Sequence, residues 1–316
     1  MGCVGVGDNA AGGKSVIPVK NTVTTAILIS LVALIFFDLM GLVIKFLSLR
    51  YAAAELSFYR NVFGTIPSVI VLWSSTAWHQ NGRKLRIRQW GLICARGVIV
   101  TLAQFMFYMS LGRMDFATAT TISYSGALFM TAFAVVLLAE QVGVIRWIAV
   151  GIGFAGVVLV MGPGRGAFST DALLPVGAAA LYALTGITAR MTDEDVPSAL
   201  ANLYSTGFAV IGSLGLALSL GAFSPIDAAT DLLWIAAMGG FGGTAVLCLF
   251  ISYRMTEQSN LAPFSYFGIP LAFLLGWLFF DEAPWRDLFP GAILIVIGGL
   301  LVVWRERVRG RMVRAG

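Results

Sequence analysis

The chain has 316 residues, of which 58% are hydrophobic and only 12% are charged, and its formal net charge is +5. Soluble domains carry about 25% charged residues, so this composition excludes an ordinary water-soluble domain and indicates that lipid is the solvent. Apolar stretches near the length that crosses a bilayer, about 20 residues, recur along the whole chain. We therefore predict an all-α integral membrane protein with ten transmembrane helices. In chain order they are expected at 24–47, 53–74, 89–111, 116–138, 145–162, 172–191, 198–221, 232–253, 261–280 and 286–304.

The basic residues orient these spans. Fourteen of the 21 Lys and Arg residues fall in tails and loops on the side of the N-terminus, and five fall in loops on the other side. Positive charge is enriched in cytoplasmic loops, so both termini are predicted to lie in the cytoplasm of a multi-pass protein of the cell inner (plasma) membrane. Residues 1–23 are expected to be a flexible cytoplasmic tail and residues 305–316 a basic cytoplasmic tail.

Residues that often carry catalysis or bind metals are scarce in this sequence. Cys3, Cys94 and Cys248 share no ligand spacing, and His79, the single histidine, falls in a predicted inner loop. The basic runs are short and flank predicted spans. We therefore expect no metal, no cofactor, no nucleic-acid partner and no enzymatic activity.

An internal repeat divides the chain. Residues 137–160 overlay residues 279–302 without a gap at an offset of 142, and the first two spans of each half align at an offset of 145. At the second offset Lys45 meets Arg190 and Phe63 meets Phe208. Each half holds five spans, an odd number, so the second half must enter the membrane from the opposite side. The prediction is two inverted five-helix repeats, 24–162 and 172–304, a layout that many transporters use to expose a central site alternately to either side.

Several motifs resemble one known family. They are Lys45 at the end of the first span, "ELSFYRNVFG" (55–64), "ATATTISYSGALF" (117–129) and "LLAEQ" (137–141). Together they resemble the drug/metabolite transporter superfamily, in particular its EamA-type ten-helix members, over residues 24–304. The resemblance implies a permease for a small polar metabolite. It implies more finely an S-adenosylmethionine-like, riboflavin-like or amino-acid-like compound.

Polar residues on four predicted helices fall at one level, just outside the membrane midplane. They are Asp38, Arg60, Gln104 and Tyr124, placed by a rise of about 1.5 Å per residue. A charge at the bilayer centre costs about 2.5–3.5 kcal/mol, so it normally faces a partner or water. We expect this level, with Tyr266 from the second half, to line a substrate cavity. Asp38 then either attracts a cationic group of the substrate or only neutralises Arg60.

Three further charges lie closer to the surfaces. Arg96, about 10 Å above the inner edge of the third span, either binds an anionic or carboxylate-bearing substrate or extends to the interface. Lys45 and Glu55 are expected near the outer surface as a rim ion pair, with an outer gate as the alternative. Glu140 and Glu282 are expected to cap helix ends.

Transport by alternating access is the preferred function, with a small-molecule substrate and the lipid bilayer as partners. A proton carried by Asp38 is one candidate for coupling, facilitated diffusion or exchange is the other, and a homodimer is a candidate assembly. The alternatives are a non-transporting membrane sensor or assembly subunit, and a membrane-embedded transferase.

Overall fold

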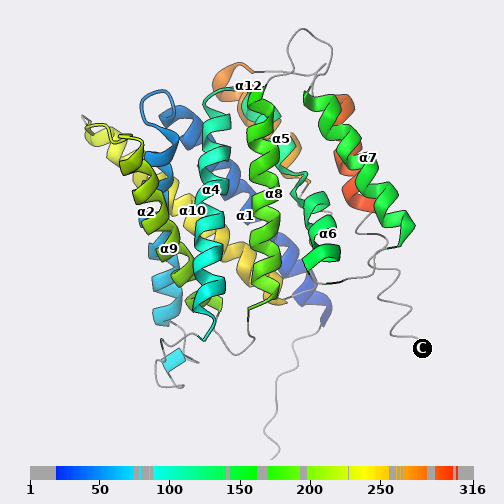
Figure 1. The fold of residues 1–316 in the computed structure, drawn as a ribbon, viewed down its shortest axis with the longest axis horizontal. Coiled ribbons are helices and arrows are strands. Elements are labelled where there is room, and N and C mark those ends of the chain that lie inside the picture. Colours follow the sequence, from blue (N-terminus) through cyan, green and yellow to red (C-terminus); the bar gives the residue numbers. More distant parts are fainter. Residues whose placement is uncertain are drawn as a thin grey trace, which may run out of the picture.

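The computed structural model describes residues 19–74, 78–79, 85, 88–137, 139, 143–161, 170–192, 198–226, 228–255, 261, 264, 266–282, 289–301 and 304. The regular elements of this part of the chain are helices, and Figure 1 shows them side by side in one bundle. Their bounds are α1 (Val19–Leu47), α2 (Ala53–Ser74), α4 (Trp90–Leu111), α5 (Phe116–Ser123), α6 (Gly126–Leu137), α7 (Val144–Met161), the short 3-10 helix η1 (Thr170–Ala172), α8 (Leu173–Arg190), α9 (Ser198–Ser219), α10 (Ala229–Met255), α12 (Gly268–Phe280) and a last helix, Phe289–Leu301.

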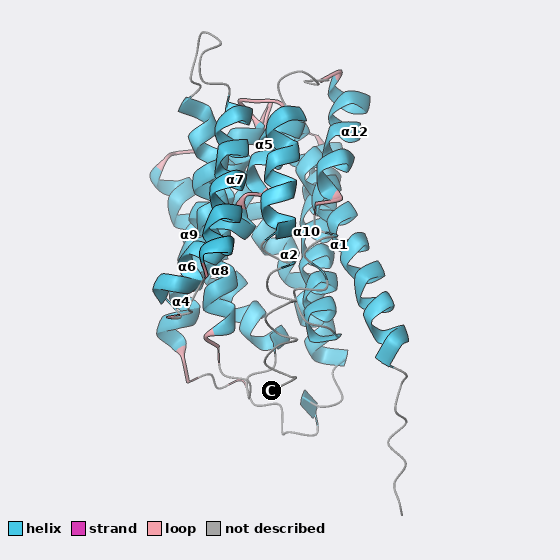
Figure 2. Ribbon diagram, turned by 90° about the vertical axis from the view of Figure 1, so that its right-hand side faces the viewer, coloured by secondary structure: helices cyan, strands magenta, loops and turns pink. Residues whose placement is uncertain are grey.

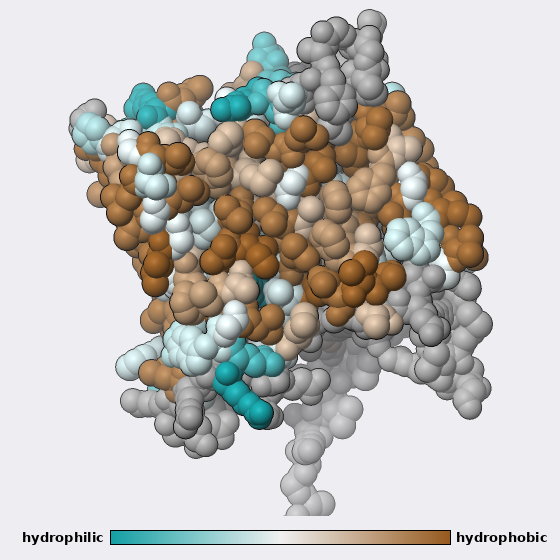
Figure 3. Space-filling view, viewed as in Figure 1, coloured by the Kyte–Doolittle hydropathy of each residue, from teal (hydrophilic) through white to brown (hydrophobic). Residues whose placement is uncertain are grey.

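The described helices are long and apolar, as a bilayer requires. Six of them, with α5 and α6 counted as one, are long and apolar enough to cross a membrane. Adding α2, α7, α12 and the last helix gives ten spans in the described residues. Figure 3 shows a broad hydrophobic belt between more hydrophilic ends. The chain is therefore a multi-pass membrane protein, with apolar side chains facing lipid around the bundle.

The packing of the helices repeats between the two halves. The first helix of each half packs most extensively against the third helix of the other half, as α1 with α10 and α8 with α4. The two second helices, α2 and α9, pack against each other, and α5 packs against α12. Contacts exchanged in this reciprocal way are those of two copies related by a twofold axis, which confirms the predicted inverted repeat.

One pair of close contacts shows the same relationship at residue level. A Cβ atom added to Gly97 of α4 would collide with Phe208 of α9, and one added to Gly239 of α10 would collide with Phe63 of α2. Phe63 and Phe208 are repeat partners at the offset of 145, and Gly97 and Gly239 are 142 positions apart. Each glycine lets the third helix of one half approach the second helix of the other, because small residues allow close backbone packing in membranes.

The fourth span of each half is interrupted, which differs from the two continuous helices predicted at 116–138 and 261–280. In the first half a turn at Tyr124 and Ser125 separates α5 from α6; in the second a turn at Tyr266 and Phe267 precedes α12. The turns are closed by short-range bonds such as Ser125 N–H to Ile122 O at 3.0 Å and Phe267 N–H to Phe264 O at 3.0 Å. Apolar run length could not reveal this, because the turn residues Tyr, Ser and Phe do not break an apolar stretch.

Other helix ends lie close to the expected ones. The predicted second span, 53–74, matches α2 at both ends. Helix α1 begins five residues earlier than predicted, and α10 extends three residues further at its start and two residues further at its end. Figure 2 shows the described loops at the two ends of the bundle. We call the end that carries residues 48–52, 112–115, 220–226 and 281–282 the Lys45 face. Glu140, residues 1–18 of the predicted N-terminal tail and all of 305–316 lie outside the described residues.

Candidate functional site

Two tyrosines, one from each repeat, face each other where the fourth spans are interrupted. The ring centroids of Tyr124 and Tyr266 are 6.4 Å apart with planes inclined at 48°. They occupy equivalent positions in "SYSG" and "SYFG", at the offset of 142. In transporters with inverted repeats, interrupted helices meeting near the centre commonly form the substrate site.

Glycine makes room for both tyrosine side chains. The Tyr124 hydroxyl occupies the space that a Cβ atom on Gly268 would fill, and the Tyr266 hydroxyl occupies the equivalent space at Gly299. Both rings are therefore held against the backbone of helices in the second half. The Tyr266 hydroxyl is buried without a hydrogen-bond partner among the described residues, and so are the hydroxyls of Thr120, Thr121 and Ser125 around the first turn.

Asp38 lies near Tyr124, one member of this pair. Asp38 is in α1 and is only 3% exposed, and its Oδ2 atom has no hydrogen-bond partner in the described part of the chain. The carboxyl group is near enough to the Tyr124 hydroxyl for the two to interact electrostatically. A buried carboxyl oxygen without a partner is costly in a membrane protein, and it is therefore suited to receive a donor from outside the chain.

Arg60 does not form the predicted ion pair with Asp38. The ion pairs of the described residues join Lys45 to Glu282, Arg50 to Asp231 and Arg113 to Asp171. The Arg60 side chain reaches its own neighbour, with Nη1 donating to Asn61 Oδ1 at 3.1 Å. The interpretation that the two charges merely neutralise each other is therefore wrong for this conformation.

Gln104 belongs to a buried amide network between α2 and α4. Its Oε1 accepts from Asn61 Nδ2 at 2.8 Å and from Ser57 Oγ at 2.9 Å, and its Nε2 donates to Asn61 Oδ1 at 3.1 Å. Asn61 also approaches Ser213 of α9 at 3.5 Å. Gln104 is therefore engaged by protein partners at both ends of its amide, and it holds two helices of the first repeat together.

Asn61 is the residue that the sequence reasoning missed. It is fully buried, follows Arg60 directly and lies one helical turn after Ser57 on the same face of α2. The sequence signal that points to Asn61 is an uncharged amide directly after an intramembrane arginine and one helical turn after a serine.

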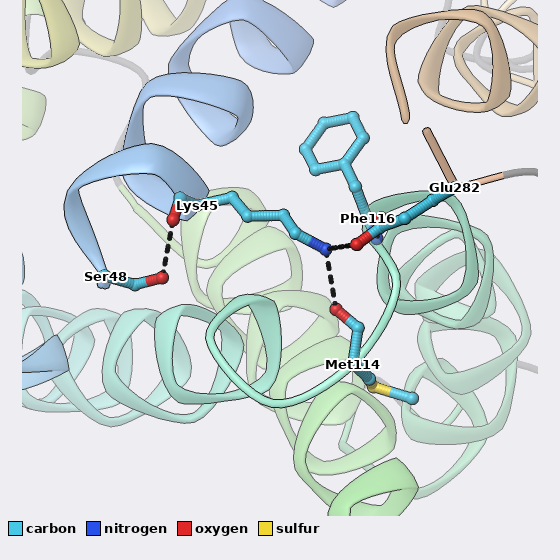
Figure 4. A network of polar contacts seen from close by, with 5 residues as sticks. All are labelled: Lys45, Ser48, Met114, Phe116 and Glu282. Carbon is cyan, nitrogen blue, oxygen red and sulfur yellow. Dashed lines mark hydrogen bonds and ion pairs between the residues drawn. The ribbon is translucent and has the colours of Figure 1, made fainter. Parts of the chain in front are cut away.

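Arg96 and Lys45 both bind groups from the second repeat. Arg96 donates from Nη1 to the carbonyl oxygen of Thr185 in α8 at 2.9 Å. Lys45 forms an ion pair with Glu282 and also donates to the Met114 carbonyl oxygen at 3.0 Å. Figure 4 shows Glu282 between Lys45 and the start of α5, where its Oε2 accepts from the Phe116 N–H at 2.8 Å.

The predicted partner of Lys45 was Glu55, and this is corrected. Glu55 is fully buried and accepts from the Ser224 backbone N–H at 3.2 Å. Glu55 lies in the first turn of α2, so it joins the start of α2 to the loop before α10. The rim ion pair is instead formed between the repeats, and Glu282 caps α5, as expected of a helix-end residue.

The structure thus sorts the predicted residues into three groups. Tyr124 and Tyr266 face each other at the interrupted helices, with Asp38 of α1 near Tyr124; Arg60 and Gln104 are linked through Asn61; Lys45, Glu55 and Arg96 make separate contacts between elements. The last group is not brought to the tyrosine pair by any contact among the described residues.

Comparison with known proteins identifies the family. The model of the EamA-like transporter family matches residues 24–162 and 170–304. A riboflavin transporter of Rhizobium johnstonii is 29% identical over 68% of this chain and 71% of its own length, and an S-adenosylmethionine uptake transporter of Rickettsia bellii is 26% identical over 89% and 92%. One solved crystal structure shares the fold with a TM-score of 0.61 at 19% identity, over 90% of this chain and 98% of the other. The chain belongs to the EamA-like transporter family.

Proposed function

We propose that this protein is a secondary transporter that moves a small organic metabolite with a flat ring system and a cationic group, of the S-adenosylmethionine-like class. The observation that carries this proposal is the position of Asp38. Its buried carboxyl group has one oxygen without a partner among the described residues and lies near Tyr124, whose ring faces that of Tyr266. A carboxylate attracts a cation, and two tyrosine rings offer faces for a planar heterocycle.

The architecture supports a transporter of the alternating-access type. Both repeats contribute a tyrosine from an interrupted fourth span, so a rotation of one repeat against the other would change which side reaches the site. The names of the two relatives support the ring-containing class, because riboflavin and S-adenosylmethionine both contain a fused nitrogen heterocycle. Of the two, only S-adenosylmethionine carries a fixed positive charge, on its sulfonium. The buried carboxyl group of Asp38 favours that compound.

The orientation belongs to the same proposal. The excess of Lys and Arg on the side of the termini favours both termini in the cytoplasm of the inner membrane, with the Lys45 face outside. The repeats would then span 24–162 and 172–304. Proton coupling through Asp38 stays a prediction, and uptake measured with and without an imposed pH gradient checks it.

Uptake into vesicles tests the proposed substrate. Purified protein in proteoliposomes is expected to accumulate radiolabelled S-adenosylmethionine. Asp38→Asn is expected to slow this uptake about 10- to 150-fold, because a hydrogen bond to a charged group contributes about 1.5–3 kcal/mol. Asp171→Asn, which removes a carboxylate exposed on the Lys45 face, is the matched control and should transport normally. Riboflavin taken up in place of S-adenosylmethionine would reject the cationic class. Vesicles that accumulate neither compound, while a second protein co-purifies, would support the sensor or assembly subunit instead.

A further inference from the structure

Arg60 is a buried cation in α2. Its residue is 7% exposed, and no carboxylate among the described residues forms an ion pair with it. Among the described residues its Nε atom has no hydrogen-bond partner, and its Nη1 atom donates to the neutral amide of Asn61. A guanidinium group buried in a membrane protein normally pairs with an acid or lines a path for an anion. The described chain does not supply the acid.

The guanidinium group lies between the two repeats. A Cβ atom on Gly242 of α10 would come within 2.8 Å of Arg60 Nε and within 2.5 Å of Met40 Sδ, so α10 and α1 both approach it. Arg60 is thus surrounded by helices of both halves, which is where an alternating-access site must lie.

Asn61 fixes the direction of the Arg60 side chain. Its Oδ1 accepts from Arg60 Nη1 at 3.1 Å and from Gln104 Nε2 at 3.1 Å, while its Nδ2 donates to Gln104 Oε1 at 2.8 Å. Because Gln104 holds the amide from both ends, the Asn61 side chain has one orientation. One Arg60 nitrogen is therefore anchored, and Nε remains available for a second acceptor.

We infer that Arg60 binds a carboxylate of the transported metabolite, that Asn61 is the positioning residue for its guanidinium group, and that the substrate is therefore a zwitterion bearing an amino-acid-like head. Guanidinium groups bind carboxylates through two parallel N–H bonds, a geometry that an ammonium cannot reproduce. Asp38 and Arg60 carry opposite charges that are not paired with each other, and a zwitterion would satisfy both. The inference rests on the proposed function and adds the anionic half of the substrate.

A pair of ligands that differ only in the carboxylate tests the inference. S-adenosylmethionine and decarboxylated S-adenosylmethionine keep the same ring and sulfonium, and phenylalanine and phenethylamine form a second such pair. Equilibrium dialysis with the purified full chain gives a dissociation constant for each compound. Wild type is expected to bind the carboxylate-bearing member at least about tenfold more tightly, the effect of one bond to a charged group.

Three variants are expected to remove this preference. Arg60→Gln removes the cation, and Asn61→Asp places a carboxylate at the atom that now accepts from Arg60 Nη1, so that Arg60 is neutralised from within. Gly242→Ala displaces the guanidinium group, whereas Gly240→Ala, two residues away with nothing within 4 Å of the added methyl group, is the matched control. In the first three variants the affinity ratio within each pair should fall toward one, while the decarboxylated member keeps its affinity. A merely structural role of Asn61 would weaken both members equally.

The outcomes separate this inference from the proposal on which it rests. Uptake of S-adenosylmethionine with equal affinity for both members of a pair overturns the carboxylate site and leaves the proposed function standing. A ratio unchanged in Arg60→Gln and in Asn61→Asp, both shown to be folded by thermal unfolding, overturns it as well. If wild type binds riboflavin but neither member of either pair, its substrate is neutral, and this result also overturns the carboxylate site. Wild type that binds and transports none of the five compounds overturns the proposed function together with the inference.

Discussion

Lys45 at the end of α1 and Glu282 just after α12 form an ion pair although they are 237 residues apart in the chain. The lysine comes from the first repeat and the glutamate from the second (Figure 4). Both side chains are mostly buried, with 12% and 21% exposed, and Glu282 also accepts from the first N–H of α5. The pair therefore joins the repeats at the Lys45 face in the conformation described by this structure.

Removing the charge of Glu282 is expected to loosen the Lys45 face. Glu282→Gln keeps an acceptor for the Phe116 N–H but loses the ion pair, at a cost of about 1–2 kcal/mol for this partly exposed site. The rate at which a membrane-impermeant thiol reagent labels Met114→Cys, in a chain whose three native cysteines are replaced by serine, should rise about 5- to 30-fold.

The Arg113–Asp171 pair is the control for this experiment. It also joins the two repeats at the Lys45 face, but its side chains are 54% and 35% exposed. Exposed pairs contribute little, so Asp171→Asn should leave the labelling rate within about twofold of wild type. Equal effects of the two substitutions would show that Glu282 does not hold the face closed.

A methyl group at Gly268 is expected to displace Tyr124. The tyrosine hydroxyl lies where the Cβ atom of Gly268→Ala would be, and overpacking of this kind costs about 1–3 kcal/mol. We expect a lower unfolding temperature in detergent and a loss of uptake, both partly restored by Tyr124→Phe, which removes the nearest atom. Gly215→Ala meets nothing within 4 Å and should behave as wild type. Normal uptake by Gly268→Ala would remove Tyr124 from the site.

The amides of Asn61 and Gln104 are expected to be energetically coupled. Each single change to alanine removes the two hydrogen bonds between the amides and leaves the remaining amide group partly unsatisfied in a buried site, which costs about 1–3 kcal/mol. The double change removes both polar groups, so it should cost less than the sum of the single changes. A double-mutant cycle on the free energy of unfolding measures this coupling, and additive effects would contradict the network.

Asp115, in the loop between α4 and α5, is expected to make stability depend on pH. Partial burial raises the pKa of Asp115 above the ordinary value of 3.8, and repulsion by Glu282 adds to this, while Lys45 acts in the opposite direction. The folded state therefore holds the Asp115 proton more tightly than the unfolded state. Stability should fall as pH rises from about 4 through the raised pKa, because the folded state must then accept the charge.

The matched variant is Asp115→Asn. It should unfold at a higher temperature than wild type at neutral pH, and the difference should vanish below the ordinary aspartate pKa, where both side chains are neutral. Parallel curves for the two proteins between pH 4 and 7 would show that Asp115 does not titrate in the predicted direction. Its side chain makes no capping hydrogen bond at the start of α5, so no cap is lost by the change.

Properties that depend on local composition were predictable from the sequence. The lengths of the apolar runs predicted the ten spans, because crossing a bilayer needs about 20 apolar residues whatever their neighbours are. The repeat, with Phe63 aligned to Phe208, predicted the inverted halves, since an odd number of spans reverses the second copy. Burial of Asp38, Arg60 and Gln104 also followed from their places in apolar helices.

Pairing between distant residues was decided only by the tertiary structure. Lys45 meets Glu282 and not Glu55, and Arg60 meets Asn61 and not Asp38, because the position of a partner depends on how two helices are rotated and how closely they approach. That approach is set by glycines such as Gly97 and Gly242 against specific side chains. The turns at Tyr124 and Tyr266 were likewise beyond prediction: hydropathy reports how apolar a segment is, and a helix can end inside the membrane wherever other helices surround its freed backbone groups.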